Sequence, residues 1–407
     1  MVPSKASVVI VGGGALGTSS AFHLADEGIE DVVLLDKGPI AQGTTPFAAG
    51  QTGYLTVDQD LLKLNQYCIE FFERFEERTG YPICFHQNGS LRIALTDSFR
   101  GGLEDRIKVA KETGDEAELI SHERVMELVP ELRLPSDASV LLIPRDGFVE
   151  PKSVAVAYAA AAAARGVSIH TGCAVTGLEI TDGRIHGVRT AEGFIESQWV
   201  VLAAGAWARQ FAGRLNFELK TVPVRHQAFV TSPITGVTGQ EPVVRFAENQ
   251  IYIRPYEGGL LVGGYGYRPL SFDMNQFAKD FEIASLESDP IYYQQLKHAA
   301  SEYFPVLKTS VTVQERRGLP TIAPDGRFVA SKTSQVEGLL IASACMVGGI
   351  FASPVIGRAI VDAILDRDSG LPLESLNADR FGSNYSSDAD LRATCESLYA
   401  NHYRRES

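Results

Sequence analysis

Residues 7–36 read SVVIVGGGALGTSSAFHLADEGIEDVVLLD, and this stretch decides the fold class. Residues 8–11 form a β-branched run that is too short for a helix and suits a strand buried on both faces. Glycines follow at once, and residues 15–27 then carry apolar side chains at helical spacing until Gly28. A second apolar run at residues 32–35 completes a strand-helix-strand unit.

Three glycines of this unit, Gly12, Gly14 and Gly17, form a G-x-G-x-x-G pattern directly after the first strand. The first allows a tight turn, the second lets the backbone approach a pyrophosphate, and the third lets helix and strand pack closely. The helix N-terminus then offers N–H groups and a favourable dipole to phosphates. Asp36 ends the second strand, where its carboxylate can accept hydrogen bonds from a ribose diol. The unit therefore predicts a dinucleotide site.

The charge balance narrows the class of partner. The chain has 407 residues, and 37 Lys and Arg residues against 50 Asp and Glu residues give a formal charge of −13. This length fits two or three domains. The acidic balance argues against nucleic acid and anionic membranes, because both favour clustered Lys and Arg. The five cysteines are scattered without metal-like spacing, so we expect no metal site, no disulfide framework and a cytoplasmic location.

One segment has the length of a membrane-spanning helix. Residues 338–357 carry no charge, but they include four glycines, Pro354 and two serines. This composition favours a buried strand, a glycine turn and the start of a helix, so we expect no membrane span. After about residue 370 the chain is polar, and we expect its end to be poorly ordered.

A second unit of strands and helix lies in the middle of the chain. Pro151 opens an alanine-rich helix over residues 154–164, and a strand resumes at residues 167–170. Asp182 and Gly183 then predict a hairpin between two amphipathic strands.

The later sequence changes character. Residues 199–203 form another buried strand, whereas residues 221–267 alternate as several strands and predict an antiparallel sheet. The fold class is therefore α/β, or α+β overall, with a Rossmann-like dinucleotide-binding domain and an interleaved antiparallel-sheet substrate domain. We assign residues 1–85, 146–218 and 318–407 to the first domain and residues 86–145 and 219–317 to the second.

With these motifs the chain resembles the D-amino acid oxidase superfamily of FAD enzymes over nearly its whole length. The resemblance is carried by the glycine motif with Asp36 and by five further segments, residues 43–45, 146–151, 201–207, 324–326 and 338–357. Within the superfamily, residues 223–227 and 251–265 are most similar to the dimethylglycine and sarcosine dehydrogenase and glycine oxidase branch. The resemblance implies FAD and oxidation of an amine C–N bond by hydride transfer to flavin N5.

The resemblance also implies a set of FAD-binding residues besides the glycines and Asp36. These are Ala15, Leu16, Lys37, Gly43, Thr44, Thr45, Ala49, Gly50, Gln51, Val175, Ala204, Gly205, Trp207, Met346, Val347, Gly348, Gly349 and Ile350. The N–H groups of Gly348 and Gly349 are expected to face the flavin N1–C2 carbonyl, where negative charge grows on reduction. Covalent members of the branch carry a flavin-linked His where this chain has Phe47, so we expect noncovalent FAD.

The substrate end departs from the family pattern. Pro320 and Phe351 stand where relatives carry the Arg and Lys that bind a substrate α-carboxylate. The candidate replacements are Arg225, Arg254, Arg268, Arg316 and Arg317. As the catalytic group we select His226, Tyr252, Arg254 and Tyr265, because strand side chains can face the flavin and orient an amine. For each of them the alternative is an ordinary, satisfied sheet residue.

The expected function is FAD-dependent oxidation of a secondary or N-methylated amine or amino acid, followed by hydrolysis of the imine. The expected partners are this small molecule and either O2 or an electron-transfer acceptor. The sequence leaves open oxidase versus dehydrogenase and homo-oligomer versus heteromeric complex. One alternative is a 2-hydroxy acid dehydrogenase on the same fold, which the lack of a recognisable His with a paired acid disfavours. The other is a flavoprotein subunit of a heteromeric amino-acid dehydrogenase.

Overall fold

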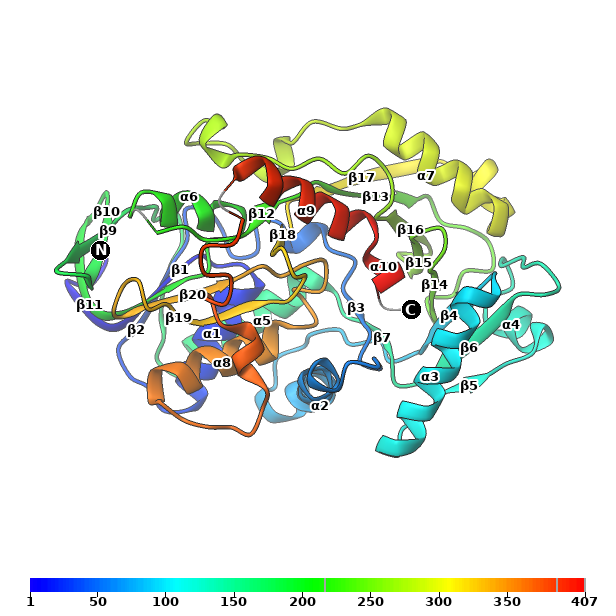
Figure 1. The fold of residues 1–407 in the computed structure, drawn as a ribbon, viewed down its shortest axis with the longest axis horizontal. Helices are drawn as coiled ribbons and strands as arrows, with labels where there is room; N and C mark the ends of the chain where they lie inside the picture. Colours follow the sequence, from blue (N-terminus) through cyan, green and yellow to red (C-terminus); the bar gives the residue numbers. More distant parts are fainter. Residues whose placement is uncertain (216, 386, 406–407) are drawn as a thin grey trace.

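Two large β-sheets organise the computed structural model, which describes residues 1–215, 217–385 and 387–405 (Figure 1). Two pairs of short strands add to them, β3 (Gln51–Thr52) with β7 (Gly147–Phe148) and β12 (Val222–Pro223) with β18 (Thr321–Ile322). The mixed α/β architecture agrees with the fold class predicted above. The residue limits of the two domains stay a prediction.

The first sheet contains the predicted strand-helix-strand units. Its strands are, in spatial order, β19 (Val329–Lys332), β20 (Leu339–Ser343), β11 (Gly193–Leu202), β1 (Lys5–Val11), β2 (Val32–Leu35) and β8 (Ser168–His170). Every pair in this row is parallel except β19 with β20. Because β1 pairs with both β2 and β11, the chain connections diverge beside it, and open α/β sheets bind ligands at such a point.

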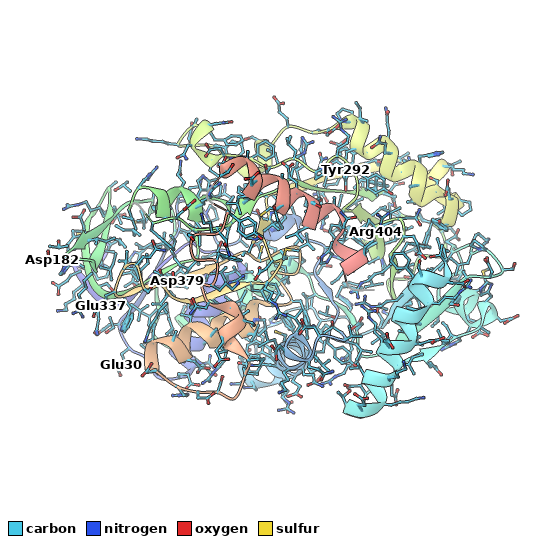
Figure 2. The ribbon with its side chains drawn as sticks, in the orientation of Figure 1. Glu30, Asp182, Tyr292, Glu337, Asp379 and Arg404 are labelled. Atoms are coloured by element: carbon cyan, nitrogen blue, oxygen red, sulfur yellow. The ribbon has the colours of Figure 1, made fainter. Side chains whose placement is uncertain are left out.

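A hairpin extends this sheet from β11. It consists of β9 (Val175–Thr181) and β10 (Arg184–Thr190), joined by Asp182 and Gly183 as predicted. Both turn residues have positive φ angles, 52° and 75°. Figure 2 shows Asp182 close to Glu337, and the N–H of Glu337 donates to the Gly183 carbonyl at 2.8 Å.

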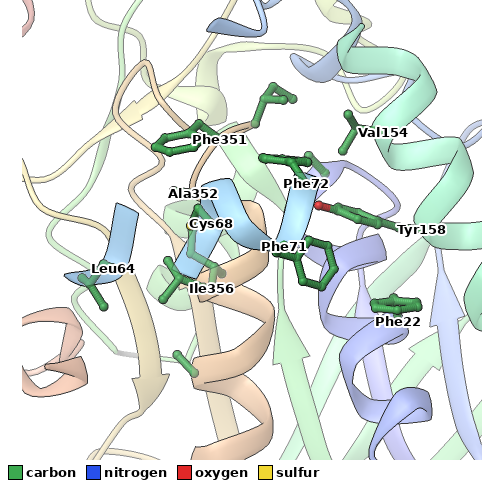
Figure 3. Close-up of a cluster of buried hydrophobic side chains, with 14 of the residues drawn as sticks. Phe22, Leu64, Cys68, Phe71, Phe72, Val154, Tyr158, Phe351, Ala352 and Ile356 are labelled. Carbon is green, nitrogen blue, oxygen red and sulfur yellow. The ribbon is translucent and has the colours of Figure 1, made fainter. Parts of the chain in front are cut away.

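Helices cover one face of the first sheet and bury an aromatic core there (Figure 3). They are α1 (Ala15–Asp26), α2 (Gln59–Thr79), α5 (Pro151–Ala163) and α8 (Ser353–Leu365). Phe22 of α1 lies 5.2 Å from Phe75 of α2 between ring centroids, and Phe72 lies 6.2 Å from Phe351. Successive β1 side chains enter cores on opposite faces, which explains the continuous apolar run. The other face packs against α6 (Ala208–Gly213).

The second sheet is the predicted antiparallel one, with one exception. Its spatial order is β17 (Thr312–Gly318), β13 (His226–Thr231), β16 (Gly259–Gly264), β15 (Ile251–Tyr256), β14 (Val243–Phe246), β4 (Ser90–Ala94), β6 (Ser139–Ile143) and β5 (Glu118–Leu119). The exception is β14, which runs parallel to β4. The helices near this sheet are α3 (Asp97–Thr113), α4 (His122–Leu128) and α7 (Pro290–Tyr303). Tyr292 of α7, labelled in Figure 2, donates its hydroxyl to the Gly264 carbonyl at 2.8 Å.

The expectation of a poorly ordered end reaches residues 406–407, which lie outside the described residues. The described part of the polar segment after residue 370 is folded. It forms α9 (Asp388–Ala400) and α10 (His402–Arg405), drawn in red in Figure 1, and α9 packs on β12 and β18. Leu391, Cys395 and Tyr399 are buried at intervals of four residues, so one face of α9 is apolar although the segment is polar on average.

Residues 338–357 fold as the sequence predicts, with β20, a turn and the beginning of α8. In the described part of the chain, no helix combines the length and the apolar character that crossing a membrane requires.

Candidate active site

A cavity of about 1180 Å³ runs from the carboxyl ends of β1 and β2 to the second sheet. Of the residues assigned to FAD from the sequence, all but Gly17 line it within the described chain. Of the four catalytic candidates, His226, Tyr252 and Tyr265 line it and Arg254 does not. The structure therefore brings the predicted FAD-binding residues and three of the four catalytic candidates to one cavity. Their roles stay predictions.

The glycine turn has the backbone geometry that a dinucleotide site requires. Gly12 has φ +113°, and a Cβ there would lie 2.4 Å from the Ala203 carbonyl oxygen. A Cβ on Gly17 would lie 1.9 Å from the Gly12 carbonyl oxygen. Gly17 thus serves the close packing of α1 on β1 rather than the cavity wall, as expected of the third glycine. Side chains at these two positions would clash with the backbone where β1 leads into α1. The turn therefore keeps the close, side-chain-free backbone that a pyrophosphate approaches, and in this respect it fits FAD.

Asp36 lies beside this turn with its carboxylate fixed. The N–H groups of Gly13 and Gly38 donate to Oδ2 and Oδ1 of Asp36 at 2.5 and 2.7 Å. Burial raises the pKa of Asp36, and these hydrogen bonds oppose the rise. Thr45 accepts the N–H of Ala15 at 3.1 Å, so its hydroxyl closes the first turn of α1.

Lys37 and Trp207 lie at the same end of the cavity. The Lys37 ammonium is 3.8 Å from the Trp207 ring centroid and donates to the Phe281 carbonyl at 2.9 Å. Burial lowers the pKa of Lys37. Several lining residues here come from a segment that the sequence analysis missed, namely Met274, Phe277, Ala278, Lys279, Asp280, Glu282 and Ile283.

The turn before α8 lines the middle of the cavity. A Cβ on Gly348 would have one neighbour within 4 Å, Phe328 at 4.0 Å, so this backbone faces open space. The N–H of Gly348, however, donates to the Cys345 carbonyl at 3.1 Å. The turn itself therefore uses one of the two N–H groups that the sequence analysis assigned to the flavin carbonyl.

The second sheet forms the far wall of the cavity around His226. Its Nε2 lies 2.7 Å from the Tyr252 hydroxyl, and its Nδ1 lies 2.8 Å from the Tyr399 hydroxyl. Burial, together with the smaller effect of the nearby His402, lowers the pKa of His226 to about 3. Burial also raises the pKa of both tyrosines. All three groups are therefore neutral near pH 7, and the wall is polar but uncharged here.

Aromatic rings from the C-terminal helices complete this wall, and the sequence analysis missed them. Tyr265 lies 5.0 Å from Tyr403 and 4.8 Å from His402 between ring centroids. Tyr403 and His402 both line the cavity. One sequence pattern could have revealed these helices. Apolar side chains recur every four residues in α9, and this spacing predicts a helix that packs on the protein.

Arg254 does not enter the described cavity wall, although it shares a strand face with Tyr252. Its Nε donates to the Ala49 carbonyl at 2.7 Å, and its guanidinium lies 4.3 Å from the Phe148 ring centroid and 3.2 Å from Glu150. These contacts cover the Arg254 side chain and separate it from the cavity. Arg254 therefore supports the loop around Ala49 on the side away from the cavity.

The other proposed carboxylate anchors also lie outside the described lining. Arg225 and Arg268 both pair with Asp289 at 2.8 Å, and Arg316 lies 4.2 Å from the Tyr256 ring centroid. The arginines that do line the cavity were not selected by the sequence analysis; they are Arg92, Arg106, Arg214, Arg245 and Arg327.

A glycine turn at the point where strand connections diverge is typical of dinucleotide-binding α/β folds, and here it opens onto a buried wall of imidazole and phenol groups. The sequence comparisons agree, because residues 7–363 match the model of the family described as FAD dependent oxidoreductase. The chain belongs to this family, which confirms the resemblance stated above.

Individual relatives place the chain in the expected branch. It is 32% identical over 386 residues to the mitochondrial dimethylglycine dehydrogenase of Homo sapiens, covering 93% of this chain and 44% of that protein. It is 30% identical over 401 residues to the mitochondrial pyruvate dehydrogenase phosphatase regulatory subunit of Mus musculus, covering 96% and 45%. The chain thus spans less than half the length of these two relatives.

The fold is also known from experiment. The crystal structure of L-proline dehydrogenase from P. horikoshii superposes with a TM-score of 0.84 at 24% identity, over 93% of this chain and 98% of that one. At this identity the likeness establishes the fold alone.

Proposed function

We propose that the chain is an FAD-dependent oxidoreductase that oxidises the C–N bond of a secondary or N-methylated amine or amino acid. The observation that carries this proposal is the continuity of the cavity from the glycine turn to the His226 and Tyr252 wall. The similarity to a protein named dimethylglycine dehydrogenase supports the substrate class.

FAD, when bound, supplies a hydride acceptor for the C–H bond next to the amine nitrogen. The chain orients the amine and controls its protonation. The buried aromatic wall disfavours a cation, so it favours the neutral amine, whose nitrogen lone pair is free to form the C=N bond. We propose that the Tyr252 hydroxyl, which lies 2.7 Å from His226 Nε2, forms the hydrogen bond that orients that nitrogen. Water then hydrolyses the iminium product.

We also propose that FAD binds noncovalently. Phe47, which cannot form a flavin bond, lines the cavity. Cys345 lines it too, but burial raises the pKa of its thiol, so it is a poor nucleophile. Acid precipitation should release the flavin into the supernatant. Flavin fluorescence that stays with the polypeptide would show this proposal to be wrong.

Anaerobic bleaching of the flavin absorbance tests the function directly. We expect sarcosine, dimethylglycine, D-proline or a simple N-methylamine to bleach it, whereas 2-hydroxy acids should not. Tyr252→Phe should slow bleaching without loss of FAD, since it removes only the orienting hydroxyl. Bleaching by a hydroxy acid alone would replace the amine proposal with the dehydrogenase alternative. Recovery in air would indicate an oxidase, and recovery only with an artificial acceptor would indicate a dehydrogenase.

A second candidate function is a flavoprotein subunit that needs a partner chain. Similarity to a protein named as a regulatory subunit favours it. Size-exclusion mass and amine oxidation by the purified chain alone separate the two candidates. A yellow protein that no amine bleaches would favour the subunit. The cytoplasmic location also stays a proposal, for which the five unpaired cysteines are the support.

A further inference from the structure

One segment from the connection between β16 and α7 lies at the nucleotide end of the cavity. Residues 273–285, which we call the strap, contain two short helical turns, η3 (Met274–Gln276) and η4 (Ile283–Ser285). The strap contributes seven residues to the cavity wall, from Met274 to Ile283. A part of the chain that follows the second sheet thus reaches a site that the sequence assigned to the glycine turn and its neighbours.

The strap is hydrogen-bonded to the loop that follows β2. Lys37 Nζ donates to the Phe281 carbonyl at 2.9 Å, and Gln42 Nε2 donates to Glu282 Oε1 at 3.0 Å. Lys37 directly follows Asp36, whose carboxylate is expected to bind the adenosine ribose. The strap is therefore attached beside the expected ribose site.

The strap is also attached to the residues that follow β11. Gln210 Nε2 donates to the Met274 carbonyl at 3.3 Å. Met274 and Ile283 are buried in a small apolar cluster on which Trp207 packs. Gln210 belongs to α6, and Trp207 directly precedes this helix, so these contacts lie beyond the carboxyl end of β11.

The two attachments flank the glycine turn. β1 lies between β2 and β11 and runs parallel to both, so the carboxyl ends of the three strands meet at one edge of the sheet. A segment attached beyond the ends of both β2 and β11 therefore crosses the end of β1, where Gly12 and Gly14 are expected to bind the pyrophosphate. FAD in this turn would have the loops of the first sheet on one side and the strap on the other.

The strap is held differently at its ends and in its middle. Beside its ends, the Phe272 N–H donates to the Pro223 carbonyl at 2.9 Å, and the Asp289 N–H donates to Gln227 Oε1 at 3.0 Å. Within the strap, backbone hydrogen bonds join residues three positions apart. Its attachments to the first sheet are side-chain hydrogen bonds and one small apolar cluster. Such a segment opens locally at a low free energy, because few buried contacts are lost.

Lys37 connects the strap with both sides of the glycine turn. Its ammonium lies 3.8 Å from the Trp207 ring centroid while it donates to the Phe281 carbonyl. Burial lowers the pKa of Lys37, and the carboxylates of Asp280 and Glu282 oppose this effect. The strap thus attracts the Lys37 cation, and this attraction favours the closed position.

We propose that the strap closes over the adenosine diphosphate end of bound FAD, and that FAD enters and leaves only while the strap is open. The proposal goes beyond substrate oxidation, because it concerns the loading and retention of FAD. Opening breaks the contacts of Lys37, Gln42 and Gln210 with the strap and leaves both sheets paired.

The exchange kinetics of FAD distinguish a closing strap from a passive wall. A side chain that only contacts bound FAD changes mainly the dissociation rate constant. A contact that keeps the strap closed slows entry and exit alike, so its removal raises both rate constants. Flavin fluorescence measures association with the full-length apoprotein, and it measures dissociation after dilution into an excess of an unrelated FAD-binding apoprotein.

Gln42→Ala removes one attachment of the strap. We expect it to raise both rate constants about 2- to 10-fold, the range for one hydrogen bond, and to change the Kd of FAD less than either. Gln276→Ala is the matched control, because Gln276 is exposed on the strap and lies outside the described cavity wall. The control should leave both rate constants unchanged.

A cross-link tests the same proposal in the opposite direction. Gln42→Cys and Glu282→Cys are combined in a Cys84→Ser background, which removes the exposed native thiol, and are joined by a short bis-maleimide. Cross-linking the apoprotein should slow FAD uptake, and cross-linking the FAD-loaded protein should slow FAD release, each by about 10-fold or more. The two single-cysteine variants, treated with the same reagent, control for the modification itself.

Cross-linked apoprotein that takes up FAD as fast as the single-cysteine controls would overturn the proposal. So would a Gln42→Ala protein in which dissociation alone is faster, because the strap would then be a passive wall. No amine is used in these measurements, so a failure of the proposed function would leave their outcome unaffected.

Discussion

Replacing Gly263 with alanine is predicted to disable the site although no polar residue is substituted. Gly263 of β16 lies opposite Tyr252 of β15 in the sheet. A Cβ on Gly263 would lie 2.1 Å from the Tyr252 hydroxyl oxygen and 2.2 Å from its Cζ. Ordinary van der Waals contact begins at 3.4 Å, so the phenol must shift by about 1.3 Å or the strands must separate.

A shift of this size is large compared with the geometry that it disturbs. The Tyr252 hydroxyl is 2.7 Å from His226 Nε2, and a movement of about 1 Å is enough to break such a hydrogen bond. Misplacement by about 1 Å typically costs about 100-fold in rate. Overpacking should also lower the free energy of unfolding by about 1–3 kcal/mol. We therefore expect Gly263→Ala to reduce the flavin about 100-fold more slowly than the wild type.

The assay is stopped-flow anaerobic flavin reduction with a saturating amine, on protein whose FAD content and melting temperature have been measured. Gly266→Ala is the matched control, because its Cβ would meet Gln250 at an ordinary 3.4 Å. Tyr252→Phe shows the effect of losing the hydroxyl alone. The reasoning is refuted if FAD-loaded Gly263→Ala reduces its flavin as fast as Gly266→Ala does.

Three further outcomes follow from the packing and the buried titratable groups. Gly17→Ala should be purified with little flavin per polypeptide, because its Cβ would lie 1.9 Å from the rigid Gly12 carbonyl; a normal absorbance ratio would contradict this. Burial lowers the pKa of His226 to about 3 from 6.5, so the unfolded chain binds more protons as pH falls from about 6.5 to 3 and stability is lost over that range. Denaturant unfolding should show a loss of about 2 kcal/mol from this residue between pH 6.5 and 5, and His226→Gln should flatten the profile. Tyr399→Phe leaves His226 Nδ1 without its 2.8 Å partner and should cost about 1–3 kcal/mol in the same assay, whereas Tyr385→Phe, at a phenol away from His226, should cost less.

The nucleotide half of the site was predictable because its signals are local. The glycine pattern, the strand before it and Asp36 lie within one short stretch, and each glycine has a steric reason that sequence alone supplies. His226 and Tyr252 were also predictable as strand residues. Their hydrogen bond was not, because it depends on how β13, β16 and β15 pair.

The arginines of the substrate end show what local patterns cannot supply. Arg92 and Arg245 are neighbours because β4 pairs with β14 in parallel. No turn or short loop connects these two strands, so the sequence carries no local signal for the pairing. Arg254 was selected as a strand residue that could face the flavin or bind a carboxylate, yet contacts with Ala49 and Phe148 cover it. Which of several strand-borne arginines reaches a cavity is decided by the segments packed above them.

The parallel pairing of β14 with β4, residues 243–246 with residues 90–93, also bears on how the chain acquires its shape. β1 likewise finds its partner β11 far along the chain, with Val8 paired to Trp199. Such contacts form slowly, because long loops must close before either sheet gains its central strands. Neither sheet can therefore form from a contiguous fragment. Cutting the gene anywhere between β4 and β11 separates both pairs of partners, so both products should have unpaired strand edges that are prone to aggregate.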